Sequence, residues 1–152
     1  MPPSAAIDEA DTPARLRVIV GKISRRLNAA ARGSGVTPTR LSTLGVIVRE
    51  GPLRLSRLAE IEGINPTMLS RVVAALDGDG LIRRKPDPDD RRACIVEATA
   101  AGRRTHDKLR AERGRILAEG LADLGADDLA RLEAALPALE AFADAVLRER
   151  TR

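Results

Sequence analysis

Basic side chains gather between residues 83 and 92 of the sequence. They are Arg83, Arg84 and Lys85, followed by Arg91 and Arg92. A guanidinium group stays charged, hydrogen-bonds phosphate oxygens and guanine edges, and can enter a narrow minor groove, where the potential is strongly negative. This run therefore predicts contact with duplex DNA. The alternative is a solvated charged turn.

Acidic residues interrupt the basic run. Asp87, Asp89 and Asp90 lie in the same turn-rich loop and would repel phosphates. We expect them to act on the protein itself, with Asp90 orienting Arg92 by an ion pair. Two prolines in the loop are expected to stiffen it.

A second polar group lies upstream, in a segment with helical periodicity. Asn65 and Pro66 form a cap-plus-proline helix start, and an Asp-Gly-Asp-Gly run at residues 77–80 ends the segment. The apolar positions follow the i, i+3, i+4, i+7 pattern of one buried helix face. They are Leu69, Val72, Val73 and Leu76.

The opposite face of this helix carries short or flexible side chains. They are Thr67, Ser70, Arg71 and Ala74. A helix that enters the major groove needs such a face, because bulky apolar groups block its approach while an arginine reaches bases or phosphates. The amides at the helix start, residues 65–67, can also point at a phosphate. An ordinary surface helix is the alternative.

Two further elements must position these side chains. A short helix, from Ser56 as N-cap to Glu62, precedes the polar helix, and Gly63 separates the two as in a helix-turn-helix. Two short strands, 81–85 and 93–97, flank the charged loop as a β-hairpin. We therefore predict a mainly α protein with a small β-hairpin wing. Its winged helix-turn-helix domain spans about residues 37–98.

Longer helices are predicted on both sides of this domain, at about residues 12–32 and 99–148, with a break near residue 125. Thr99 is expected to be the N-cap of the helix that follows the domain. Together they complete a single unit, residues 11–152, after a flexible tail at residues 1–10. Apolar stripes run along the flanking helices, for example Leu16, Val20, Ile23 and Leu27 in the first. Such a seam suits a partner helix, and the winged domain alone cannot cover every stripe. These segments are therefore expected to be dimerisation helices.

Composition narrows the classes of function. The 152 residues carry a formal net charge of +4 at pH 7, which favours a polyanionic partner, although a GC-rich genome would also enrich arginine. Cys94 is the only cysteine, and we expect it to be a small buried hydrophobe. No apolar run reaches the roughly 18 residues of a membrane span, and the N-terminus does not resemble a signal peptide. No catalytic triad, phosphate loop or metal cluster is recognisable. We expect a cytoplasmic protein that is not an enzyme and has no cofactor.

The segment from Leu53 to Thr99 resembles the MarR family of bacterial regulators, named for multiple antibiotic resistance. The resemblance rests on residues 58–59, 70–76, 80–84, 87–92 and 99–102. In the wing, Val96 and Ala98 stand where the family usually has leucines. The flanking helices match in number and order, so the resemblance covers nearly the whole chain.

The resemblance implies a transcription regulator, and we expect a repressor that binds a pseudo-palindromic operator as a homodimer. In this family the first, fifth and sixth helices of two chains interlock. The expected DNA-binding residues are Asn65, Pro66, Thr67, Ser70, Arg71, Arg83, Arg84, Asp90, Arg91 and Arg92. A DNA-binding architectural protein without an effector is the alternative.

A small, often aromatic, ligand is a further implication of the resemblance. In the family it binds between the dimer helices and the winged domain and usually releases DNA. The chain has no Trp or Tyr and a single Phe. The candidate ligand-binding residues are therefore Phe142 and His106. For His106, a partly buried interface histidine is the alternative.

Overall fold

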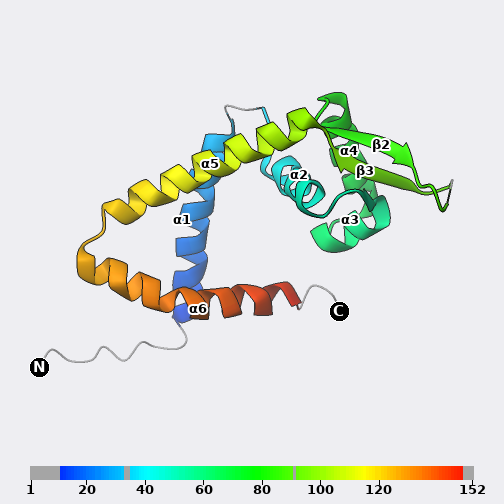
Figure 1. Cartoon of the computed structure of the whole chain (residues 1–152). Coiled ribbons are helices and arrows are strands. Elements are labelled where there is room, and N and C mark those ends of the chain that lie inside the picture. Colours follow the sequence, from blue (N-terminus) through cyan, green and yellow to red (C-terminus); the bar gives the residue numbers. More distant parts are fainter. Residues whose placement is uncertain (1–10, 33–34, 91, 149–152) are drawn as a thin grey trace, which may run out of the picture. The chain divides into compact units, whose positions relative to one another are not determined.

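The computed structural model describes residues 11–32, 35–90 and 92–148, with the backbone alone for residues 30–32 and 147–148. The elements are α1 Thr12–Arg32, α2 Pro38–Glu50, β1 Leu53–Arg54, α3 Leu55–Glu62, α4 Pro66–Gly78, β2 Ile82–Pro86, β3 Cys94–Ala98, α5 Ala100–Ala122 and α6 Ala126–Arg148 (Figure 1). The predicted mainly α class with a small hairpin is confirmed. The predicted tail, residues 1–10, lies outside the described residues. The chain divides after Thr37 into two compact units, and α2 to α6 belong to the second.

The core of the second unit lies between α2, α3, α4 and the sheet. Its fully buried aliphatic side chains are Leu44, Ile47, Leu58, Val73, Leu76, Ile82 and Val96. On α4 the buried side chains are those of the predicted apolar face. Burying one such side chain contributes about 1.5–3 kcal/mol to folding. This core therefore fixes α4 and the hairpin with respect to each other.

Helices α3 and α4 form the expected helix-turn-helix, but α3 begins earlier than predicted. Arg54 is its N-cap residue and supplies no side-chain hydrogen bond, so the assignment of Ser56 as N-cap is wrong. The preceding strand runs directly into the helix and leaves no turn for a serine to cap. At the other end Gly63 adopts the left-handed conformation, with a φ of 60°, and its amide donates to the carbonyl of Ala59. Glycine takes this conformation without steric cost.

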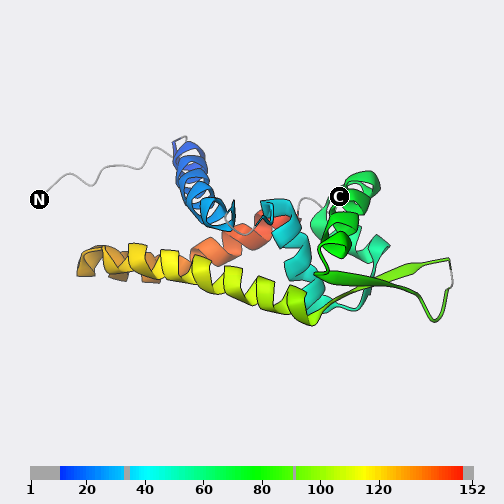
Figure 2. The ribbon, with the colours of Figure 1, turned by 90° about the horizontal axis from the view of Figure 1, so that it is seen from above.

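The sheet has three antiparallel strands in the order β1-β3-β2. The hairpin pairs Ile82 with Ala98 and Pro86 with Cys94, so both of its strands lie one residue later than predicted. Strand β1 was not predicted from the sequence, because two residues after a proline are too few to show strand alternation. Figure 2 shows β2 and β3 projecting beyond the helices of this unit, as a wing does.

The start of α5 packs closely against the backbone at the start of the wing. The Thr99 hydroxyl donates to the carbonyl of Gly80 (2.7 Å) and accepts from the amide of Gly102 (3.0 Å), which confirms Thr99 as the N-cap. A Cβ added to Gly102 would lie 1.9 Å from the carbonyl oxygen of Leu81. Only glycine therefore fits where α5 passes over this backbone.

The long helices carry apolar side chains that the chain by itself leaves exposed. They are Val18, Ile19, Val20 and Ile23 on α1, Leu117 and Leu121 on α5, and Leu136, Leu139, Phe142 and Val146 on α6. None of the described side chains of α6 is buried. A helix of this kind is marginal in water unless its apolar face packs against something. In the described part of the chain, no helix is long and apolar enough to cross a membrane.

Candidate nucleic-acid interface

The exposed face of α4 is the first part of the candidate interface. The short or flexible side chains predicted for it are all exposed and lie opposite the buried face; they are Thr67, Ser70, Arg71 and Ala74. Asn65 caps the helix, since its Oδ1 accepts from the amide of Met68 at 2.8 Å, and Pro66 follows in the first turn. Among the first three residues of α4, Pro66 has no amide N–H and the Met68 amide donates to Asn65, which leaves the Thr67 amide at an exposed helix N-terminus, where an anion is favoured.

Met68 belongs to the same surface, although it was not among the DNA-binding residues predicted from the sequence. Its side chain is 43% exposed. It stands three residues before Arg71, and residues with this spacing are neighbours on a helix surface. The sequence could have indicated this residue, because Met68 is a large apolar residue outside the apolar stripe of the helix.

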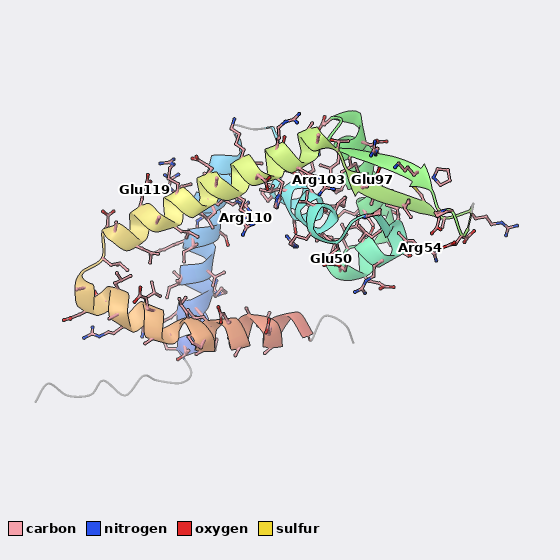
Figure 3. All side chains as sticks on the ribbon, viewed as in Figure 1. Glu50, Arg54, Glu97, Arg103, Arg110 and Glu119 are labelled. Carbon is pink, nitrogen blue, oxygen red and sulfur yellow. The ribbon has the colours of Figure 1, made fainter. Side chains whose placement is uncertain are left out.

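The base of the wing holds one carboxylate between two cations. Glu97 on β3, labelled in Figure 3, pairs across the hairpin with Arg83 and Lys85 on β2. Hydrogen bonds from Lys85 and Arg83 hold the pKa of Glu97 below its usual value. The charge of Arg83 is therefore partly compensated within the protein. Arg84 alternates to the opposite face of β2 and is exposed.

The wing loop is anchored by Asp87, which is only 4% exposed. Arg54 on β1, labelled in Figure 3, donates to its Oδ2, and the amide of Asp89 donates to its Oδ1 at 2.8 Å. The hydrogen bond from Arg54 is the main cause that lowers the pKa of Asp87. The expectation that loop aspartates act on the protein thus holds for Asp87. Its partner was missed because β1 was not predicted.

Asp90 shapes the tip of the wing, but not in the way predicted. Its Oδ1 accepts from the amide of Arg92 at 3.0 Å, and its carbonyl accepts from the amide of Ala93 at 2.8 Å. Both side chains are described, and they form no ion pair with each other, so the predicted ion pair is wrong. A short carboxylate two residues before an amide closes a turn on the backbone instead.

Three arginines of this surface keep uncompensated charge. Arg71, Arg84 and Arg92 are exposed, and none forms an ion pair with another described residue. The predicted contact Arg91 lies outside the described residues. Guanidinium groups of this kind donate hydrogen bonds to phosphates and to base edges. The arrangement suits DNA, with one arginine on the helix and two on the wing.

The predicted ligand-binding residues lie on different helices. The side chain of His106, on α5, is 12% exposed. It lies against α2, since a Cβ added to Gly45 would be 3.3 Å from its Nε2. Phe142, on α6, is 48% exposed. Cys94, which was expected to be a small buried hydrophobe, is half-buried.

Comparison with known proteins agrees with this geometry. A family model described as "MarR family" matches residues 36–94, which span α2 to the start of β3. The uncharacterized HTH-type transcriptional regulator Mb0904 of Mycobacterium bovis is 30% identical over 129 residues, or 85% of this chain and 90% of that protein. The chain belongs to the MarR family. As a MarR-family protein it is a helix-turn-helix transcription regulator that binds DNA, and regulators of this family are not enzymes.

Solved structures of similar proteins share the fold of this MarR-family chain. The YusO protein of Bacillus subtilis has a TM-score of 0.76 and 25% identity, covering 91% of this chain and 98% of that one. The MepR F27L mutant of S. aureus, bound to an oligodeoxyribonucleotide, has a TM-score of 0.67 and 16% identity, covering 87% and 97%. The long flanking helices thus belong to the shared fold as well as the winged domain.

Proposed function

We propose that this MarR-family chain is a repressor that binds a pseudo-palindromic operator as a homodimer. The observation that carries the proposal is that one unit presents an exposed polar helix face, on α4, together with a projecting wing whose arginines are uncompensated. These two elements suit the two grooves of DNA. Helix α4 reads base edges in the major groove, and the wing inserts an arginine into the minor groove.

The bound oligodeoxyribonucleotide in the MepR mutant supports the same assignment, because that protein shares the fold. Contacts to bases are proposed for Thr67, Ser70 and Arg71. Contacts to phosphates are proposed for the helix start at residues 65–67 and for Arg84. A transcription regulator works where the chromosome is, so we place its action in the cytoplasm of a bacterial cell.

The proposed dimer rests on the apolar side chains that α1, α5 and α6 leave exposed. On α6, Leu136, Leu139, Phe142 and Val146 are exposed and spaced three, three and four residues apart, as on one helix-packing face. A second copy related by a two-fold axis would cover this face, and interlocked interfaces of this type bury about 2,000 Å² or more. Two copies of α4 would then enter successive major grooves, about 10 base pairs apart.

We also propose that binding of a small aromatic ligand releases the protein from DNA. His106 supports it, since this largely buried side chain lies on a proposed dimer helix and against α2 of the winged domain. An architectural protein without an effector is the competing proposal. A thermal-shift screen of small aromatic acids separates the two, because a ligand that binds the folded state raises the melting temperature.

The experiment that tests the function is selection of bound fragments from a random duplex pool, followed by footprinting. We expect a two-fold symmetric site whose half-sites are centred about 10 base pairs apart. Affinity for the selected site should fall steeply with salt, because lysines and arginines release counterions from phosphates. A single asymmetric half-site, or binding indifferent to salt, would overturn the proposal.

A further inference from the structure

Met68 is an apolar residue on an otherwise polar surface. Among the described residues, every other large hydrophobic side chain that is exposed lies on α1, α5, α6 or the turn between α5 and α6. Those side chains have a proposed partner in the second copy of the chain. Met68 instead lies on α4, 43% exposed, on the surface proposed to meet DNA. Its exposure therefore needs a different explanation.

The backbone fixes where Met68 sits on this helix. Its amide donates to Oδ1 of Asn65 at 2.8 Å, and Met68 is the third residue of α4. The N-terminal residues of a recognition helix are the ones that contact base edges. The next residue, Leu69, is buried in the core. Met68 therefore lies at the edge of the exposed face, beside Arg71, where its bulk does not hold the helix out of the groove.

The major groove offers one apolar group on its base edges, the 5-methyl group of thymine. The other base-edge groups are hydrogen-bond donors and acceptors, which a thioether matches poorly. Methionine is unbranched and polarizable, so it adapts its shape to a small apolar contact. We infer that Met68 contacts the 5-methyl group of a thymine in each half-site and thereby selects thymine at that position. This inference rests on the proposed function of α4 as the recognition helix.

The same geometry limits where the thymine lies. An α-helix rises 1.5 Å per residue, so Met68 and Arg71 are separated by about 4.5 Å along the axis. Neighbouring bases of one strand are about 3.4 Å apart. The thymine should therefore lie within about one or two base pairs of the position read by Arg71. Loss of one buried methyl group, about 0.8 kcal/mol, corresponds to about fourfold in Kd per half-site, and to about 15-fold when both half-sites are changed.

The experiment replaces thymine with deoxyuridine, which removes the 5-methyl group and leaves the base pairing unchanged. Duplexes selected by the full-length wild-type protein are synthesised with one thymine per half-site replaced at a time. Kd is measured by fluorescence anisotropy for the wild type and for Met68→Ala, Met68→Gln and Met68→Leu. Thermal melting of each variant reports folding, which an exposed side chain should affect little.

The wild type should lose about 15-fold in affinity when one symmetric pair of thymines near the Arg71 position is replaced. Met68→Ala and Met68→Gln should be indifferent to that replacement, whereas Met68→Leu should keep part of the discrimination because it remains apolar. The inference is overturned if the wild type ignores every replacement, if no thymine lies near that position, or if Met68→Ala discriminates as well as the wild type. Failure of the wild type to select any duplex would instead overturn the proposed function itself.

Discussion

The guanidinium of Arg54, on the edge strand β1, donates a hydrogen bond to the buried carboxylate of Asp87 in the wing loop. Strand β1 runs directly into α3, the first helix of the helix-turn-helix. The pair therefore joins the loop of the wing to the element that leads into the DNA-reading helices. Through it, the wing and α4 keep one relative orientation, as their proposed entry into two grooves of DNA requires.

We expect Asp87→Asn to destabilise the protein near neutral pH and to weaken its response to acid. The folded pKa of Asp87 is lowered, chiefly by the hydrogen bond from Arg54, so the ionised carboxylate stabilises the fold. This stabilisation is fully present above the ordinary aspartate pKa of about 3.9 and is lost as the pH falls through the lower folded value, because the unfolded state then binds more protons. Urea unfolding from about pH 7 to pH 3, at one protein concentration, measures it.

The matched control for this prediction is Glu60→Gln. Glu60 pairs with Arg57 on the same helix, and both side chains are exposed. Exposed pairs of this kind contribute little to stability. The stability difference between wild type and Asp87→Asn should shrink below about pH 4, whereas the Glu60 variant should follow the wild type throughout. If the free energy of unfolding of Asp87→Asn falls with pH as steeply as that of the wild type, the hydrogen bond from Arg54 does not stabilise the ionised carboxylate of Asp87.

We expect Gly102→Ala to destabilise the protein by about 1–3 kcal/mol, as overpacking of a tight contact does. The added Cβ would lie 1.9 Å from the carbonyl oxygen of Leu81, so either α5 or the start of the wing has to move. Gly114→Ala is the control in the same helix, since nothing lies within 4 Å of its added Cβ. It should stabilise by up to about 1 kcal/mol through helix propensity. Equal effects at the two positions in urea unfolding would contradict the contact.

The helices of the fold could be predicted from the sequence, because the residues that cap a helix and set its periodicity lie within the helix or next to it. Thr99 and Asn65 cap their helices as predicted, and the apolar face of α4 follows from periodicity alone. Strand β1 was not predicted, because its two residues show no pattern by themselves and become a strand only by pairing with β3. Ser56 was misassigned for the same reason, since the start of α3 depends on that strand.

The candidate site could also be predicted only in part from the sequence. Exposure of Arg71 followed from the periodicity of its helix, and exposure of Arg92 followed from its place in the predicted loop of the hairpin. The partners of Asp87 and Asp90 did not, because charge pairing across a loop depends on which atoms the fold brings together. Asp87 finds an arginine 33 residues away, and Asp90 closes a turn on the backbone two residues ahead.

We expect the double substitution of Leu136 and Leu139 by Glu to halve the mass measured by light scattering, to about that of the 16.3 kDa chain. Two carboxylates on the exposed apolar stripe of α6 would have to be buried without partners in the proposed interface, which is costly. Ala134→Glu, on the exposed opposite side of the helix, is the control and should leave a dimer. A wild type that is already monomeric at micromolar concentration would contradict the proposed dimer.

We expect Arg71 and Arg92 to play separable roles in DNA binding. Arg71→Ala should lose about 1–3 kcal/mol and relax preference at one or two positions per half-site, because α4 reads base edges. Arg92→Ala should weaken binding to every site with a narrow minor groove and leave the major-groove preferences nearly unchanged, because the wing reads shape. Specificity profiles on a library of site variants measure both. The assignment is wrong if Arg92→Ala erases major-groove discrimination while Arg71→Ala leaves it intact.

The carboxylate of Asp90 accepts from the amide of Arg92 and forms no ion pair with its guanidinium. We expect Asp90→Ala to bind DNA more weakly than Asp90→Asn, because the asparagine side-chain oxygen can still accept from that amide and hold the turn. Both variants remove the same negative charge, so any relief of repulsion from phosphates is common to the two. The difference in Kd between them therefore reports the turn alone. Equal affinities for the two variants would show that Asp90 acts only through its charge and does not position Arg92.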